Sequence, residues 1–368
     1  MIRLLVMSDL HLRNTIYTQG KKLEGDAEYA IEQIQRISEI VKPTAVIIAG
    51  DIFDRKTVDG TELYLAKKLM SAVKSKETPV LTIQGNHDVG DKSIIEVLSD
   101  TKNINNRIEP IEGITIGGLD WKHDTISILR EKTKDTRPPA ARPAPLNGVN
   151  VLVLHESMRP FANFGNPNKL SIDDMPVNTL CIVGDTHLPE FITKTTDEGI
   201  KYVLSPGCLY PNNKTELTRE SAAVWIVDVD VKDGNILVEA QKVPLRCREA
   251  YDMSDMSVDA VLTTIANSEA PSVLKTVLYV NRDDVKTILN AEKADHFIIA
   301  PIKKKREDDT KSTESIGMLS ASFEDRLFAA VSVLDKNDAE TCTKELVSLY
   351  NSDQLNAHIE KIIEEVSK

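Results

Sequence analysis

The feature that most constrains this chain is a short apolar run that ends in Asp, Asn or His and occurs five times. At residues 80–83 the run is followed by Gly85 and then by Asn86, His87 and Asp88. Four other runs end in the same kinds of residue, and they contribute Asp9 and His11, Asp51, His155, and Asp185 and His187. A carboxylate or an imidazole beside a buried run is costly unless it binds something. The five strand ends therefore predict one ligand cluster.

Residues 1 to about 245 have the pattern of one α/β domain. In the first 120 residues, apolar strands alternate with helical periodicity at residues 22–41 and 61–73. This alternation predicts a sheet with helices on both faces, whose ligands gather at the carboxyl ends of the strands. A turn is expected at Gly117-Gly118, a hairpin turn at Asp233-Gly234-Asn235, an exposed loop at 132–148, and further strands at 149–154, 180–183, 201–204 and 222–229.

The pattern changes after residue 245. Residues 246–302 predict a small α/β cap domain, with helices at 258–265 and 285–289 and strands at 276–280 and 297–299. A charged segment at 303–320 contains Lys303, Lys304, Lys305 and Arg306; we expect a solvated linker, and a DNA-contacting patch is the alternative. Residues 321–368 predict amphipathic C-terminal helices, which could pack on the body of the protein or dock on a partner.

Composition and charge narrow the class of protein. The 368 residues are 41% hydrophobic and 28% charged, as in an ordinary globular chain, and no stretch approaches the roughly 18 apolar residues of a membrane span. No signal peptide is recognisable, and four scattered cysteines predict free thiols, so we expect a cytoplasmic protein. The net charge of −12 repels nucleic acid at long range. A DNA substrate would therefore require bound cations, a local basic patch or a partner.

The candidate side chains favour divalent cations. Carboxylates, imidazoles and an amide suit Mn, Fe or Zn, and they do not resemble an all-sulfur site. The set has more donors than one ion needs. Two ions about 3.5–4 Å apart that share a carboxylate would use these donors and would suit in-line attack on phosphorus. The sequence therefore predicts hydrolysis of a phosphoester.

These motifs resemble those of the calcineurin-like metallophosphoesterases. The similarity covers about half the chain and consists, in the family's order, of Asp9-x-His11, Gly50-Asp51, Gly85-Asn86-His87-Asp88, His155 and Gly184-x-x-His187. It implies a metallophosphoesterase β-sandwich flanked by helices. Residues 8–12, 50–54 and 205–209 are in addition similar to the SbcD-type recombination nucleases, which also have a small cap domain and C-terminal helices that dock on a coiled-coil ATPase.

The resemblance implies a role for each residue of the cluster. One ion would be held by Asp9, His11, Asp51 and His187, and the other by Asp51, Asn86, His155 and Asp185, with Asp51 bridging. His87 would protonate the leaving oxygen or stabilise charge on the phosphate, and Asp88 beside it is expected to be a second catalytic residue. We expect two divalent metal ions, Mn²⁺ in the first place, with Mg²⁺ or Fe²⁺ as alternatives.

Two positions depart from the family's pattern. The family usually has G-H-x-H where this chain has Gly184-Asp185-Thr186-His187. A carboxylate at Asp185 adds negative charge and favours Mn²⁺ or Mg²⁺ over Zn²⁺. Asp54 stands where some relatives carry a histidine, and it could instead orient a ligand without binding metal itself.

Three functions are consistent with the sequence. The first is a metal-dependent DNA exonuclease and endonuclease subunit of an SbcCD-like recombination, replication and repair complex, acting on duplex ends, hairpins or single strands. Its partners would be DNA and a coiled-coil SMC-like ATPase, with a homodimer of this chain inside a heterotetramer, in the host cytoplasm if the protein is phage-encoded. The second is a metallophosphatase or phosphodiesterase for small phosphoesters. The third is a catalytically inactive scaffold with the same fold.

Overall fold

A computed structural model describes residues 1–13, 25–75, 77–88, 98, 101–121, 148–159, 170–211, 216, 221–271 and 273–302. The chain divides into two compact units, the first Met1–Glu249 with Ser272–Lys275 and the second Ala250–Pro271 with the residues from Thr276 onward. The predicted loop at 132–148, except Gly148, lies outside the described residues, as do the linker at 303–320 and the helices at 321–368. Within the described ranges, no helix is long and apolar enough to cross a membrane.

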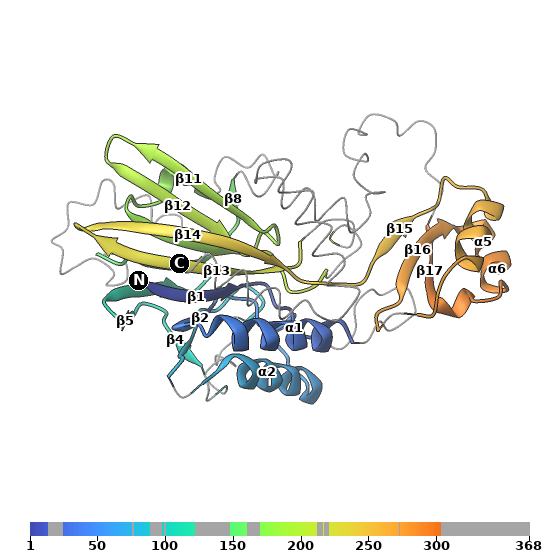
Figure 1. The fold of residues 1–368 in the computed structure, drawn as a ribbon, viewed down its shortest axis with the longest axis horizontal. Coiled ribbons are helices and arrows are strands. Elements are labelled where there is room, and N and C mark those ends of the chain that lie inside the picture. The colour runs from blue at the N-terminus through green and yellow to red at the C-terminus, as the bar shows by residue number, and fades with distance from the viewer. Residues whose placement is uncertain are drawn as a thin grey trace. The chain divides into compact units, whose positions relative to one another are not determined.

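The first unit contains two six-stranded sheets (Figure 1). The first sheet has the order β14-β13-β1-β2-β3-β4, with bounds β1 Ile2–Met7, β2 Ala45–Ile48, β3 Val80–Thr82, β4 Lys102–Asn103, β13 Ala223–Lys232 and β14 Asn235–Pro244. Strands β1 to β4 are parallel, whereas β13 is antiparallel to β1 and forms with β14 the hairpin predicted at Asp233-Gly234.

The second sheet has the order β11-β12-β10-β7-β6-β5, with bounds β5 Ile108–Ile111, β6 Ile114–Leu119, β7 Val151–His155, β10 Thr179–Gly184, β11 Glu190–Thr196 and β12 Gly199–Ser205. Its central strands β6, β7, β10 and β12 are parallel, and its two edge strands are antiparallel to their neighbours. Parallel strands end at one edge of their sheet, so the polar residues that follow them are brought together.

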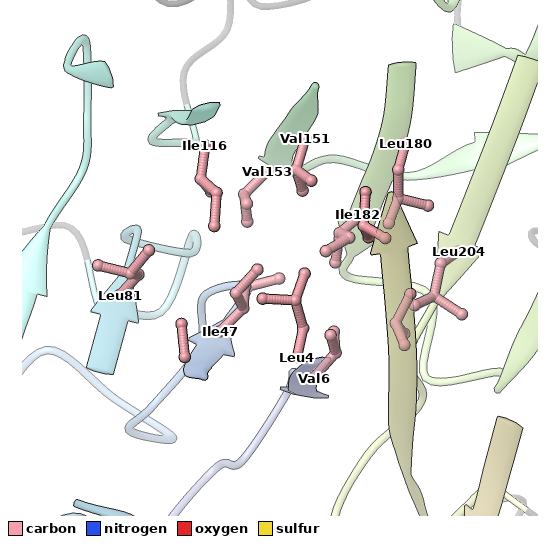
Figure 2. Packing of buried hydrophobic residues seen from close by; sticks show 14 of the residues in the cluster. Leu4, Val6, Ile47, Leu81, Ile116, Val151, Val153, Leu180, Ile182 and Leu204 are labelled. Atoms are coloured by element: carbon pink, nitrogen blue, oxygen red, sulfur yellow. The ribbon is translucent and has the colours of Figure 1, made fainter. Parts of the chain in front are cut away.

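The two sheets share one apolar core (Figure 2). Leu4 of β1 and Ile47 of β2 lie in the same buried cluster as Val153 of β7 and Ile182 of β10. Successive side chains of a strand point to opposite faces, so every second residue of these strands enters the core. The prediction of helices on both faces of the first sheet is therefore wrong, because one face packs on the second sheet. The mixed α/β fold with sheets flanked by helices is confirmed.

Two helices accompany the first sheet, α1 Asp26–Val41 and α2 Gly60–Val73, and they pack against each other (Figure 1). Helix α1 buries Ala30, Ile31 and Ile34, which are spaced as expected for an amphipathic helix. Helix α2 starts at a capping box, in which the Asp59 side chain accepts hydrogen bonds from the first turn and Glu62 accepts one from the Asp59 N–H. The sequence predicted both helices.

The other face of the second sheet packs against a short segment with bounds β8 Met158–Arg159, β9 Leu170–Ser171 and a 3₁₀ turn Ile172–Asp174. Gly117 and Gly118 lie inside β6, so the turn predicted there is wrong. A Cβ on Gly118 would lie 2.6 Å from Ile83 and 2.9 Å from Ile104. Glycine is needed there for close packing between the sheets, and not for a turn.

The second unit contains a three-stranded parallel sheet in the order β15-β16-β17. Its elements are β15 Ala250–Asp252, α5 Val258–Ala266, β16 Thr276–Asn281, a 3₁₀ turn Arg282–Asp284, α6 Val285–Leu289, a 3₁₀ turn Ala294–His296 and β17 Phe297–Ile302. Ile265, Leu278 and Ile288 belong to its separate buried core. The helices and strands predicted for residues 258–299 are confirmed.

Candidate metal centre

The loops that follow the parallel strands are hydrogen-bonded to one another. Asp9 N–H, after β1, donates to Gly50 O after β2 at 3.2 Å, and His11 N–H donates to Asp51 O at 3.0 Å. Asp185 N–H, after β10 of the other sheet, donates to Asp9 Oδ1 at 3.0 Å. The first two bonds join neighbouring loops of the first sheet and the third joins the two sheets, so side chains distant in sequence converge at one edge of the sandwich.

The backbone at five of the predicted ligands has an uncommon conformation. The φ angle is 51° at Asp9, 40° at His11, 51° at Asp51, 82° at Asp185 and 53° at His187. Residues other than glycine rarely adopt positive φ, which costs roughly 1–2 kcal/mol each. Such conformations persist where the surrounding structure enforces them, and they cluster at functional sites. The strained backbone at these five strand-end residues therefore indicates a functional site.

One group of donors consists of Asp9, His11 and His187, whose candidate ligand atoms all lie within 4.8 Å of one another. The His11 and His187 Nε2 atoms are 3.1 Å apart. His187 Nε2 lies 3.4 Å from Asp9 Oδ1, and His11 Nε2 lies 3.7 Å from Asp51 Oδ2. Asp9 and His11 are buried.

A second group surrounds the fully buried His155 and includes Asp9 and Asp51. The Nδ1 atom of His155 donates a hydrogen bond to Ala49 O at 2.7 Å, because a carbonyl oxygen can only accept. Its Nε2 therefore faces the cluster, 3.0 Å from Asn86 Oδ1 and 3.3 Å from Asp51 Oδ2. Asp51 Oδ2 thus approaches both His11 and His155, one from each group.

Asp185 lies at the border of the second group. Its Oδ1 is 4.0 Å from His155 Nε2, and its other oxygen accepts a hydrogen bond from Ser157 Oγ. It does not belong to the groups of three within 4.8 Å that the described residues form. Its backbone and its serine partner hold the carboxylate beside the cluster.

His87 and Asp88 have different environments. His87 N–H donates to Asp51 Oδ1 at 2.9 Å, and His87 Nδ1 donates to Asp54 O at 2.6 Å. The carboxylate of Asp88 is buried and accepts hydrogen bonds from the backbone N–H groups of Ile52, Phe53 and Gly85. Burial and the nearby Asp51 charge raise the pKa of Asp88 to about 7. Asp88 therefore ties the loop after β2 to the loop after β3.

Glycines allow this close approach. A Cβ on Gly184 would lie 2.3 Å from Ala49 O, 2.4 Å from Ser8 Oγ and 2.6 Å from His155 Nδ1. A Cβ on Gly50, which has a φ of 88°, would lie 2.4 Å from His155 Nδ1. Only glycine fits at these two positions while β2, β7 and β10 end so close to one another.

The electrostatics of the cluster favour a bound cation. Burial opposes ionisation of Asp9 and Asp51, yet the neighbouring imidazoles lower the pKa of both carboxyls. Burial opposes protonation of His155 and His187, yet the carboxylates outweigh it and raise their pKa to about 10 and about 11. Buried carboxylates that draw protons onto imidazoles need positive charge, which divalent cations would supply to a donor set of this composition. The residues fit a metal centre.

Two further carboxylates contact the candidate ligand histidines, and one of them, Asp54, forms a third donor group within 4.8 Å with His11 and His87. Glu216 Oε1 accepts a hydrogen bond from His187 Nδ1 at 3.0 Å. Asp54 Oδ1 lies 3.5 Å from the buried His11 Nδ1, and its other oxygen accepts a hydrogen bond from Arg13 at 2.6 Å. The sequence pattern points to Asp54 but not to Glu216, because Glu216 lies in a segment that matches no motif.

Comparisons with known proteins agree with this arrangement. The family model described as calcineurin-like phosphoesterase matches residues 2–189. A protein of Archaeoglobus fulgidus named "DNA double-strand break repair protein Mre11" is 24% identical over 280 residues, which are 69% of this chain and 62% of the relative. A protein of Methanocaldococcus jannaschii with the same name is 23% identical over 229 residues, 60% of each chain. The chain thus spans about 60% of the length of these two relatives.

Among solved structures, the crystal structure of TT1561 of Thermus thermophilus is similar over 67% of this chain and 99% of that chain, at 11% identity and a TM-score of 0.38. The family model covers half of the sequence and every predicted ligand of the cluster. With its mixed α/β fold and its converging carboxylates and imidazoles, this chain belongs to the calcineurin-like phosphoesterase family of metal-dependent hydrolases.

Proposed function

We propose that this chain is the metal-dependent nuclease subunit of an SbcCD-like DNA recombination and repair complex. It hydrolyses DNA phosphodiester bonds as an exonuclease and endonuclease, with two divalent cations, Mn²⁺ first among them. The observation that carries the proposal is the approach of Asp51 Oδ2 to imidazoles of the first and the second donor group, 3.7 Å from His11 and 3.3 Å from His155. One carboxylate between two sets of donors suits a pair of ions.

We assign the ligands as the family pattern implies. One ion is held by Asp9, His11, Asp51 and His187, and the other by Asp51, Asn86, His155 and Asp185. Bound there, the cations would activate water as the nucleophile and neutralise charge that develops on the phosphoryl oxygens. The Asp185 carboxylate, hydrogen-bonded to Ser157, is a harder metal ligand than the imidazole that the family usually has at this position. It therefore favours Mn²⁺ or Mg²⁺ as the second ion.

His87 transfers the proton to the leaving oxygen. Because its Nδ1 donates to Asp54 O, the proton that it can give up is on Nε2. After the transfer, the neutral ring keeps its hydrogen bond to Asp54 O and stays oriented. Asp88 acts on catalysis through the backbone, since its three accepted hydrogen bonds hold the loop that carries Asn86 and His87.

DNA is proposed as the substrate because the relatives are named for double-strand break repair. With a net charge of −12, attraction to DNA requires bound cations, a local basic patch or a partner, and we propose a coiled-coil SMC-like ATPase as that partner. We propose a homodimer of this chain with two ATPase chains, in the cytoplasm.

The test is a nuclease assay on linear duplex DNA and hairpins with the full chain, with and without Mn²⁺, and with a coiled-coil ATPase added. We expect Mn²⁺-stimulated degradation that His87→Ala reduces by roughly 10²–10⁴-fold. His296→Ala is the matched control, because His296 belongs to the 3₁₀ turn of the second unit. If the protein hydrolyses small phosphoesters but not DNA, it is a small-molecule phosphatase or phosphodiesterase. If it binds no metal, it is an inactive scaffold.

A further inference from the structure

We propose that Glu216 is the positioning residue of the metal centre: it holds the His187 ring so that Nε2 faces the cation. This inference rests on the proposed metal-dependent function and adds to it a residue outside the family's motifs. Glu216 lies 29 residues after His187, between β12 and β13, and no sequence motif marks it as a functional residue.

The two ring nitrogens of His187 have separate partners. Its Nε2 lies 3.4 Å from Asp9 Oδ1 and 3.1 Å from His11 Nε2, so this nitrogen belongs to the donor group. Its Nδ1 lies 3.0 Å from Glu216 Oε1. The nitrogens point away from each other, so Glu216 lies behind the ring and does not share the cation with Nε2. A carboxylate in this position fixes the tautomer and increases the basicity of the coordinating nitrogen.

Glu216 is itself held in place and largely shielded from water. Its backbone carbonyl accepts a hydrogen bond from Ser221 Oγ at 3.4 Å, and its side chain is 12% exposed. The His187 side chain is 23% exposed and follows a strand end in the left-handed conformation, with a φ of 53°. A partly exposed ring can rotate about its side-chain bonds unless its second nitrogen is held, so the carboxylate fixes the orientation of the His187 ring.

His11 offers the internal comparison. Its Nδ1 is buried and forms no hydrogen bond, with Asp54 Oδ1 at 3.5 Å, while Arg13 takes the other Asp54 oxygen at 2.6 Å. His155 is held by Ala49 O instead of a carboxylate. Of the three proposed ligand histidines, His187 is therefore the one whose Nδ1 is hydrogen-bonded to a carboxylate. We expect the orientation of its ring to depend on that carboxylate.

The experiment compares Glu216→Ala, Glu216→Gln and the control Glu198→Ala, which changes an exposed glutamate in the turn between β11 and β12. Mn²⁺ affinity is measured by calorimetry on the full chain, and the His187 tautomer by ¹⁵N NMR on the protein loaded with diamagnetic Zn²⁺. We expect roughly 10–100-fold weaker Mn²⁺ binding for Glu216→Ala, a smaller loss for Glu216→Gln, and none for Glu198→Ala. The Nδ1–H signal of His187 should shift in both Glu216 variants.

Mn²⁺ affinity within about twofold of wild type and an unchanged His187 signal in both variants would overturn the inference. If Glu216→Ala does not fold, Glu216→Gln decides, because it keeps the size and an acceptor oxygen. A wild-type chain that binds Mn²⁺ but does not degrade DNA would contradict the proposed function without contradicting the role of Glu216. A wild-type chain that binds no metal would defeat both.

Discussion

Replacing Gly184 by alanine should test whether the metal centre requires the three strand ends to touch. The new Cβ would lie 2.3 Å from Ala49 O, 2.4 Å from Ser8 Oγ and 2.6 Å from His155 Nδ1, about 1 Å closer than ordinary contact at 3.4 Å. Because the shortest contact is with the backbone oxygen of Ala49, the end of β10 or the backbone after β2 must move by about that amount. A displacement of about 1 Å at a catalytic centre costs roughly 100-fold in rate, and overpacking costs about 1–3 kcal/mol of stability.

The assay is Mn²⁺-dependent hydrolysis of a chromogenic phosphodiester, together with urea unfolding of the same samples. Gly60→Ala is the matched control, since no atom lies within 4 Å of the Cβ that it adds at the start of α2. We expect Gly184→Ala to lose roughly 100-fold in kcat/KM while Gly60→Ala keeps full activity. Activity of Gly184→Ala within about threefold of wild type would refute the reasoning, because the strand ends could then separate without consequence.

Three further predictions follow from the contacts described. The pKa values of about 10 for His155 and about 11 for His187 mean that both rings carry an extra proton at neutral pH, which a cation bound by these rings would have to displace. Affinity should therefore rise as the pH rises from about 6 to about 9, with up to about two protons released per site in calorimetry across buffers; a pH-independent affinity would contradict this. Asp54→Ala should weaken Mn²⁺ binding by about 10-fold in calorimetry while the His87 bond to the backbone carbonyl of residue 54 survives; unchanged affinity would show that His11 needs no partner. Arg248→Ala should cost about 3–5 kcal/mol in urea unfolding, because the buried Asp26 carboxylate loses two hydrogen bonds at 3.2 and 2.9 Å; a loss below about 1 kcal/mol would contradict a buried charge pair.

The sequence predicted the features that depend on local periodicity. An apolar run that ends in a polar residue marks a buried strand and its carboxyl end, so Asp9, Asp51 and His155 could be placed on strand ends without coordinates. Helices α1 and α2 and the hairpin after β13 were predictable for the same reason. Their assembly at one edge follows from the parallel direction of the strands.

Features that depend on contacts distant in sequence could not be predicted from it. Strands β2 and β7 are buried along their whole length, and such a strand has the same pattern whether a helix or a second sheet covers it. This is why residue patterning led to helices on both faces. Gly118 has the composition of a turn, but its role depends on Ile104 in a neighbouring segment. Glu216 contacts His187 from a segment without any motif, and only the folded chain reveals that contact.

The left-handed backbone at Asp9, His11 and Asp51 affects how this protein can evolve. Glycine adopts positive φ without the penalty of roughly 1–2 kcal/mol that other residues incur. Substituting glycine at any of these positions would relieve this backbone strain and delete a proposed ligand at the same time. The strain at these positions can therefore be removed by glycine only together with a candidate metal donor, so we expect the strained conformation to persist where the hydrolytic site is under selection.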